Sequence, residues 1–132
     1  MNKIFIVDDD DSILRLYKQF LESKGFDVID NAQNGAEAIE KYLRFKIKPD
    51  LIIMDYHMPL KDGILATKEI LKIDRNVKIV LISGDCTIKE EALIAGAIEF
   101  KKKPFGLQEL YSFVSTLIYK NNEKIRPRIH VC

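Results

Sequence analysis

Short runs of apolar residues alternate along the chain with longer segments in which apolar residues recur at helical spacing. The central run, residues 51–54, holds four consecutive apolar side chains and stops at Asp55. Pro49 before it, and Pro59 and Gly63 after it, leave no room for a helix. A short, continuously apolar run is typical of a parallel strand that is buried on both faces. We therefore predict a central strand with Asp55 at its carboxyl end.

Four further runs have a similar character and predict strands at residues 3–7, 26–29, 77–82 and 97–103. Apolar residues at intervals of three and four predict five amphipathic helices, over residues 13–21, 36–43, 65–73, 88–95 and 107–118. Gly25 follows the first helix and is expected to end it in a left-handed conformation. Strands that alternate with helices predict an α/β fold, a parallel sheet with helices on both faces.

Of the open strand orders, the flavodoxin-like order 2-1-3-4-5 suits five strands, and we expect this doubly wound (βα)5 architecture. The strand at 26–29 is expected near an edge of the sheet. In this order the first and third strands are neighbours where the strand order reverses. Ligands of such sheets bind beyond the carboxyl ends of the strands, so residues that follow these two strands are candidates for chemistry.

The overall composition narrows the class of protein. A chain of 132 residues fits one domain, and we predict a domain over 1–120 and a polar tail, or the start of a linker, over 121–132. The formal net charge of +1 does not indicate the basic surface that is typical of nucleic-acid-binding proteins. Neither a signal peptide nor a membrane helix is predicted. We therefore expect a cytoplasmic protein that binds neither nucleic acid nor membrane directly.

Carboxylates follow the two strands that are expected to be neighbours. Asp8 and Asp9 follow the first strand, and Asp55 follows the third. Crowded carboxylates repel one another and raise a pKa, and a hard divalent cation such as Mg²⁺ relieves this. Helix capping needs a single acid, so it does not explain the run of four acids over 8–11.

Two more polar residues are expected at the same edge of the sheet. Ser83 follows the fourth strand and Lys103 follows the fifth. A carboxylate nucleophile, a cation, an ammonium and a hydroxyl together suit phosphoryl transfer. The alternative for Lys103 is a solvated run of lysines, because Lys101 and Lys102 precede it.

On these residues the sequence resembles a two-component response-regulator receiver domain of the CheY-like, single-domain kind. The resemblance covers residues 3 to about 120, and its specificity lies in the order and spacing of motifs that are weak alone. These motifs are Ile6-Val7-Asp8-Asp9-Asp10, Met54-Asp55-Tyr56-His57-Met58-Pro59 with Asp62-Gly63, Leu81-Ile82-Ser83-Gly84, Gly96-Ala97 and Lys103-Pro104-Phe105.

The resemblance implies that Asp55 accepts a phosphoryl group from a sensor histidine kinase or a histidine phosphotransfer protein. It implies Mg²⁺, or alternatively Mn²⁺, bound by Asp9, Asp55 and the backbone carbonyl of His57, with Asp8 acting through a water molecule. Such a receiver catalyses only its own phosphorylation and dephosphorylation, so we do not expect an enzyme.

Further roles are implied by the same resemblance. Ser83 and Lys103 would hold phosphate oxygens. Phe100 occupies an aromatic switch position, which turns inward when Ser83 moves toward the phosphate. His57 and Asp85 occupy the positions that tune the rate of phosphate loss.

The resemblance also bears on the fifth strand and on output. An unidentified output protein would bind the face formed by the fourth helix, the fifth strand and the fifth helix. Lys101 departs from the apolar residue that is usual in this strand and is expected to extend along a sheet edge. The Lys103–Pro104 peptide bond is often cis in the family.

Three alternatives remain at this stage. The chain could be the N-terminal receiver of a longer transcriptional regulator with a DNA-binding domain, interrupted in a linker after Asn121. A haloacid-dehalogenase-like phosphatase would require Asp-x-Asp, whereas His57 stands two residues after Asp55. A receiver that binds partners without phosphate conflicts with the complete set of acceptor residues.

Overall fold

The computed structural model describes residues 2–119, which form one parallel sheet covered by helices on both faces. The sheet has the order β2-β1-β3-β4-β5, as predicted. Its strands are β1 (Lys3–Val7), β2 (Asp27–Ala32), β3 (Leu51–Asp55), β4 (Lys78–Ser83) and β5 (Glu99–Lys102). The helices are α1 (Asp11–Ser23), α2 (Gly35–Arg44), α3 (Gly63–Ile73), α4 (Lys89–Ile94) and α5 (Leu107–Tyr119), and a 3₁₀ turn, η1 (Cys86–Ile88), precedes α4.

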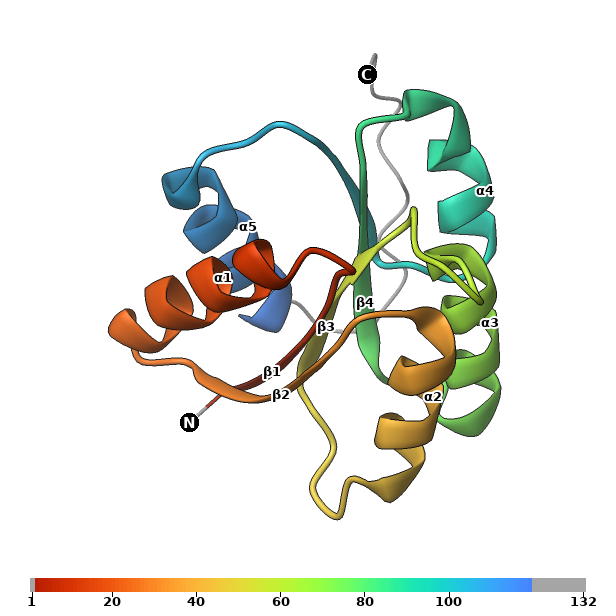
Figure 1. The fold of residues 1–132 in the computed structure, drawn as a ribbon, viewed down its shortest axis with the longest axis horizontal. Helices are drawn as coiled ribbons and strands as arrows, with labels where there is room; N and C mark the ends of the chain where they lie inside the picture. The colour runs from red at the N-terminus through yellow and green to blue at the C-terminus, as the bar shows by residue number, and fades with distance from the viewer. Residues whose placement is uncertain (1, 120–132) are drawn as a thin grey trace.

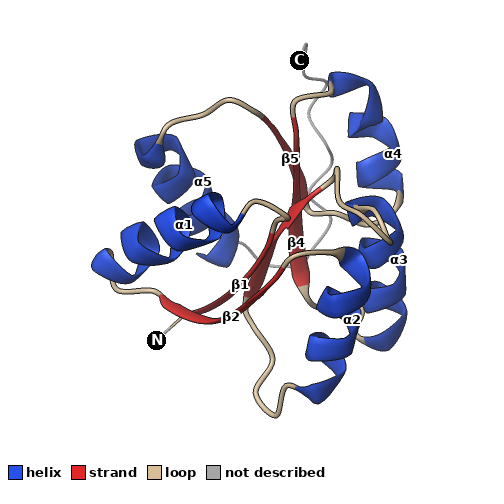
Figure 2. Ribbon diagram, viewed as in Figure 1, coloured by secondary structure: helices blue, strands red, loops and turns tan. Residues whose placement is uncertain are grey.

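The two faces of the sheet bury two separate hydrophobic cores. Helices α1 and α5 cover one face, and α2, α3 and α4 cover the other (Figures 1 and 2). Successive side chains of a strand point to opposite faces, so β1 contributes to both cores. Ile4 and Ile6 belong to the core beneath α1 and α5, whereas Phe5 and Val7 belong to the other.

Strand β3 lies at the centre of the sheet, and all five of its residues are buried. It pairs in parallel with β1 on one side and with β4 on the other. In the register of these pairs Met54 lies beside Val7, and Asp55 lies beside Ile82. The strand ends that carry the candidate residues are therefore level with one another.

The end of the first helix confirms an expectation from the sequence, and its start shows a structural role for the acidic run. The Asp10 side chain caps α1 by accepting a hydrogen bond from the backbone N–H of Ser12. Gly25 follows the helix with a φ of +92°, which a residue with a side chain rarely adopts. The acidic run thus supplies a helix cap as well as the buried carboxylate of Asp8.

The main difference from prediction is the length of β2. The strand is at the edge, as expected, but it continues through Asp30 and Asn31 to Ala32. These polar residues are rare in strands and suggest a loop. Backbone pairing with β1 nevertheless extends to Ala32, because an edge strand can leave polar side chains half-exposed.

The fifth strand and the loop after it agree with the expectations from the family. The Lys103–Pro104 peptide bond is cis. The Lys101 ammonium lies 5.5 Å from the ring centroid of Phe113 in α5. The lysine therefore places its charge over an aromatic face at the sheet edge, a favourable cation–π arrangement.

Two expectations concern membranes and the end of the chain. Among residues 2–119, no helix combines the length and hydrophobicity that a bilayer crossing requires. The predicted tail or linker over 121–132 lies outside the described residues.

Candidate functional site

Three carboxylates meet at the carboxyl ends of β1 and β3. Asp8 and Asp9 directly follow β1, and Asp55 is the last residue of β3. One carboxylate oxygen from each residue lies within 4.8 Å of the others. Asp8 and Asp55 are only 4% and 6% exposed, whereas Asp9 is exposed. The predicted convergence of these acids is confirmed.

Backbone hydrogen bonds fix the position of Asp8. Its N–H donates to the carbonyl of Ala32 at 3.0 Å, which continues the pairing with β2 by one residue. Its Oδ1 accepts from the N–H of Asp10 at 2.9 Å. Because its backbone and side chain are both held, Asp8 has little freedom to move away from the other acids.

Lys103 enters the site from the loop after β5. Its Nζ lies 2.7 Å from Oδ1 of Asp55 and 3.5 Å from Oδ2 of Asp8. Its backbone N–H donates to the carbonyl of Ser83 at 2.9 Å, which fixes the loop to β4. Lys103 is therefore aimed at the carboxylates and is not part of a solvated run.

The electrostatics of the site follow from burial and crowding. Burial raises the pKa of Asp8 to about 6; the Asp10 N–H opposes this shift and the charge of Asp55 adds to it. Burial also raises the pKa of Asp55, although the hydrogen bond and charge of Lys103 oppose the shift. For Lys103, burial favours the neutral amine, but the hydrogen bond and charge of Asp55 outweigh it and raise the pKa.

The donor set fits a magnesium ion. With the three carboxylates and the ammonium ionised, the site has a formal net charge of −2, which one divalent cation neutralises. Carboxylate oxygens are hard ligands, which Mg²⁺ prefers. The buried acids with raised pKa values are the groups that would gain most from a nearby cation.

Ser83 ends β4 and is almost fully buried. Its Oγ accepts a hydrogen bond from the N–H of Asp85 at 3.0 Å. The Asp85 carboxylate in turn accepts from the backbone N–H and the hydroxyl of Thr87, and these bonds lower the pKa of Asp85. The bond from Asp85 does not use the Ser83 hydroxyl hydrogen, so this hydrogen can be donated to an acceptor in the site.

His57 lies on the exposed side of the carboxylates. Its ring meets that of Tyr56 edge to face, with centroids 4.7 Å apart. A positive charge on the imidazole would oppose the rise in the pKa of Asp55 and add to the lowering of the pKa of Asp85. An open hollow of ≈ 450 Å³ beside the site is lined by Asp9, Tyr56, His57, Met58 and Asp62.

Phe100 lies away from these residues, in the core between the sheet and α4. It is 5% exposed and belongs to the same cluster as Ala92 and Leu81. The ring is therefore turned inward in this structure.

The sequence did not identify every residue near the site. Burial raises the pKa of Tyr17, and the charges of Lys103, Asp8 and Asp55 also act on it, so the phenol is close to the site. Its helical spacing indicated only that it faces the core. Tyr56, Met58 and Asp62 line the hollow, although the sequence gave them no role beyond membership of a motif.

Comparison with known proteins agrees with this geometry. The family model described as "Response regulator receiver domain" matches residues 4–115. The chain belongs to the response regulator receiver family. It is 43% identical over 105 residues to the chemotaxis protein CheY of Thermotoga maritima, an alignment that covers 78% of this chain and 86% of that protein. CheY-like relatives of this kind are signalling proteins and not enzymes.

Two solved structures resemble this receiver over most of its length. A chain in the CheX–CheY–BeF₃–Mg²⁺ complex from Borrelia burgdorferi aligns over 90% of both chains, with a TM-score of 0.84 and 31% identity. The response regulator TrrA of T. maritima, in complex with Mg²⁺–BeF, has a TM-score of 0.79 and 33% identity. That alignment covers 89% of this receiver and 99% of TrrA.

Proposed function

We propose that this receiver accepts a phosphoryl group on Asp55 from the phosphohistidine of a sensor histidine kinase or a histidine phosphotransfer protein. The observation that carries the proposal is the arrangement around Asp55, whose carboxylate lies beside two other acids and 2.7 Å from the Lys103 ammonium. A nucleophilic carboxylate with positive charge aimed at it suits phosphoryl transfer.

In the proposed reaction, a carboxylate oxygen of Asp55 attacks phosphorus while the phosphorus–nitrogen bond of the donor breaks. The electron pair of that bond returns to the imidazole, and the product is an aspartyl phosphate. Lys103 would pass its hydrogen bond from Asp55 to a phosphoryl oxygen. Ser83 would donate its hydroxyl hydrogen to another oxygen, which requires the side chain to move toward the phosphate.

Mg²⁺, or Mn²⁺ in its place, would be held by Asp9, Asp55 and the backbone carbonyl of His57, with Asp8 acting through water. The ion supplies positive charge for the phosphoryl oxygens, which accumulate negative charge during transfer. The two solved relatives that carry Mg²⁺ with a beryllofluoride group support this requirement.

His57 and Asp85 are proposed to set the lifetime of the aspartyl phosphate. His57 borders the open hollow, through which water would reach the phosphorus. The Asp85 carboxylate accepts hydrogen bonds from the backbone N–H and the hydroxyl of Thr87. We expect both residues to change the rate of hydrolysis more than the rate of phosphorylation.

Output is proposed to occur through a protein partner that binds the face formed by α4, β5 and α5. Ile94 of α4 is a large apolar side chain that remains 78% exposed. Phe100 lies inside the same region and would couple it to Ser83. We propose a cytoplasmic receiver that acts through proteins, with the DNA-binding regulator as the alternative.

The test is phosphorylation by a small donor. We expect the intact mass of the wild-type protein to increase by one phosphoryl group when it is incubated with acetyl phosphate and Mg²⁺. Asp55→Asn should remain unmodified under the same conditions, and EDTA should abolish the modification of wild type.

Asp11→Asn is the matched control, because it removes an exposed carboxylate of the same acidic run, which pairs with Arg15 in α1. It should be labelled like wild type. Absence of labelling in wild type, or equal labelling of Asp55→Asn, would contradict the proposal.

A further inference from the structure

The amino end of α2 contacts the loop that carries the site from β3 to α3. The backbone N–H of Gly35, the first residue of α2, donates to the carbonyl of Lys61 at 3.1 Å. A Cβ atom on residue 35 would lie 2.5 Å from that carbonyl oxygen and 2.7 Å from the Cβ of Lys61. Both distances are too short for real contacts. A side chain at residue 35 therefore requires the backbone of the loop to move.

The β3–α3 loop is short and internally connected. It begins directly after Asp55, and the N–H of Gly63 donates to the carbonyl of Tyr56 at 2.9 Å. Lys61 donates its N–H to Pro59, and its Nζ lies 2.6 Å from Glu69 of α3. Displacement of Lys61 would therefore be transmitted to the residues that border Asp55 and the hollow.

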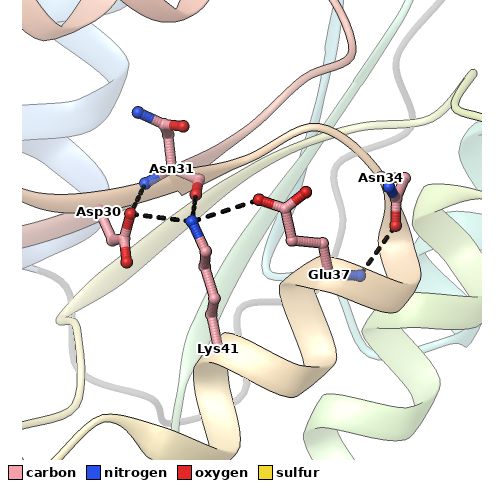
Figure 3. A network of polar contacts seen from close by, with 5 residues as sticks. All are labelled: Asp30, Asn31, Asn34, Glu37 and Lys41. Carbon is pink, nitrogen blue, oxygen red and sulfur yellow. Dashed lines mark hydrogen bonds and ion pairs between the residues drawn. The ribbon is translucent and has the colours of Figure 1, made fainter.

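Helix α2 is itself held firmly against β2, as Figure 3 shows. The Lys41 ammonium lies 3.1 Å from the Asp30 carboxylate, 2.7 Å from the Asn31 carbonyl and 3.2 Å from the Glu37 carboxylate. The Asn34 side chain caps the helix by accepting from the N–H of Glu37 at 2.8 Å. Because the helix is anchored next to its first turn, a clash at Gly35 would displace the loop more readily than the helix.

We infer that Gly35 is a positioning residue, through which the amino end of α2 fixes the β3–α3 loop and thereby the geometry of the acidic site. The backbone of Gly35 is not in the left-handed region, so close approach to Lys61 is the reason for glycine. This inference deepens the proposed function and rests on it for its effect on phosphorylation. Its geometric part, the coupling of residue 35 to the loop, does not depend on that function.

The test compares Gly35→Ala with Gly106→Ala, a control because a Cβ at residue 106 would meet nothing within 4 Å. Magnesium affinity is measured by calorimetry, and the initial rate of labelling by acetyl phosphate is measured by intact mass. Because small misplacements of reacting groups are costly, we expect Gly35→Ala to weaken magnesium binding and slow labelling by about three- to thirtyfold. Gly106→Ala should leave both quantities unchanged.

A spectroscopic readout separates positioning from general destabilisation. In ¹H–¹⁵N spectra of the metal-free protein, Gly35→Ala should shift the amide signals of residues 56–58 and 60–63 while the signals of β4 and β5 stay in place. If wild type binds no magnesium and accepts no phosphate, the proposed function fails, yet these shifts still test the contact. Unchanged loop signals would overturn the inference whatever the outcome for wild type.

Lys61→Ala provides a second variant if Gly35→Ala does not fold. This variant removes the ion pair between the loop residue Lys61 and Glu69 of α3. Lys68→Ala, at an exposed position of α3, is its control. We expect magnesium affinity to fall about twofold in Lys61→Ala, as for a half-exposed ion pair, and to stay constant in Lys68→Ala. Wild-type magnesium affinity in each loop variant that folds would overturn the inference.

Discussion

Asp8 is buried under conditions that an isolated carboxylate would avoid. It is 4% exposed and close to two other acids, and the Lys103 ammonium is nearer to Asp55 than to Asp8. At neutral pH, folding therefore removes the charged Asp8 carboxylate from water, and the Lys103 ammonium compensates only part of the lost hydration. This destabilisation is expected for a cation site that is already formed in the metal-free protein.

The direction of the Asp8 pKa shift predicts how this destabilisation depends on pH. Asp8 has a folded-state pKa of about 6, against 3.8 for an ordinary carboxyl. The folded state thus binds the proton more tightly, so Asp8 lowers stability as pH rises from about 4 to 6. We predict that Asp8→Asn raises the free energy of unfolding of the metal-free protein by about 1–3 kcal/mol at pH 7.5.

Urea unfolding in EDTA checks this prediction at pH 7.5 and at pH 4. The gain should shrink at pH 4, where the carboxyl is largely protonated in the folded state. Asp11→Asn, whose carboxylate is exposed, should not show this gain at pH 7.5. A gain of equal size at both pH values would mean that the charge of Asp8 is not its cause.

The Lys41 ammonium of helix α2 adds a polar attachment to the sheet edge. Lys41 is shared by two carboxylates and one carbonyl, and it joins the helix to the end of β2 (Figure 3). We predict that Lys41→Met, which keeps the apolar stem, lowers the free energy of unfolding by about 1 kcal/mol. The side chain is 32% exposed, so salt should weaken the effect by screening.

The measurement is urea unfolding at low and at high NaCl concentration. Lys68→Met, at an exposed position of α3, serves as the control and should change stability little. A loss in Lys41→Met that is no larger than in the control would show that α2 is held by its apolar face alone.

At the level of elements, short apolar runs were sufficient to predict all five strands, and helical periodicity was sufficient to predict all five helices. The ends of β2 and of α4 were less predictable. Asp30 and Asn31 indicate a loop when taken alone, yet pairing with β1 makes them part of the strand. The segment before α4 forms a 3₁₀ turn capped by Asp85, and helical spacing does not distinguish such a turn from an α-helix.

For the whole molecule, the strand order explains why distant residues form one site. Asp8, Asp9, Asp55 and Lys103 come from three strands whose carboxyl ends lie at one edge of the sheet. Their convergence was predictable because the sequence indicated both the strand order and the residue types. The contact of Gly35 with Lys61 could not be predicted, because it depends on how closely α2 approaches the β3–α3 loop.

This arrangement predicts that magnesium stabilises the whole fold. Ligand binding to the folded state alone adds about 2.7 kcal/mol at a free concentration one hundred times the dissociation constant. We expect Mg²⁺ to raise the melting temperature of wild type, and EDTA to reverse the rise. Asp9→Asn, which removes an exposed member of the cluster, should lose most of the increase.

Differential scanning calorimetry with increasing Mg²⁺ gives this measurement, and K⁺ at equal ionic strength serves as the control. A similar rise with K⁺ would indicate screening of the acids and not a specific site.

The complete burial of β3 keeps its four apolar residues away from the protein surface, so Asp55 at its end is the residue of this strand available for chemistry. No side chain of this strand except the carboxylate at its tip has a task outside the interior. Related receivers can therefore differ in their outer helices and loops, and so in their binding partners, while they keep the same strand and the same reactive aspartate. A chimera can test this idea. It would combine the outer helices and loops of one receiver with the β3 strand of another, and it should bind the partners of the first receiver while still accepting a phosphoryl group.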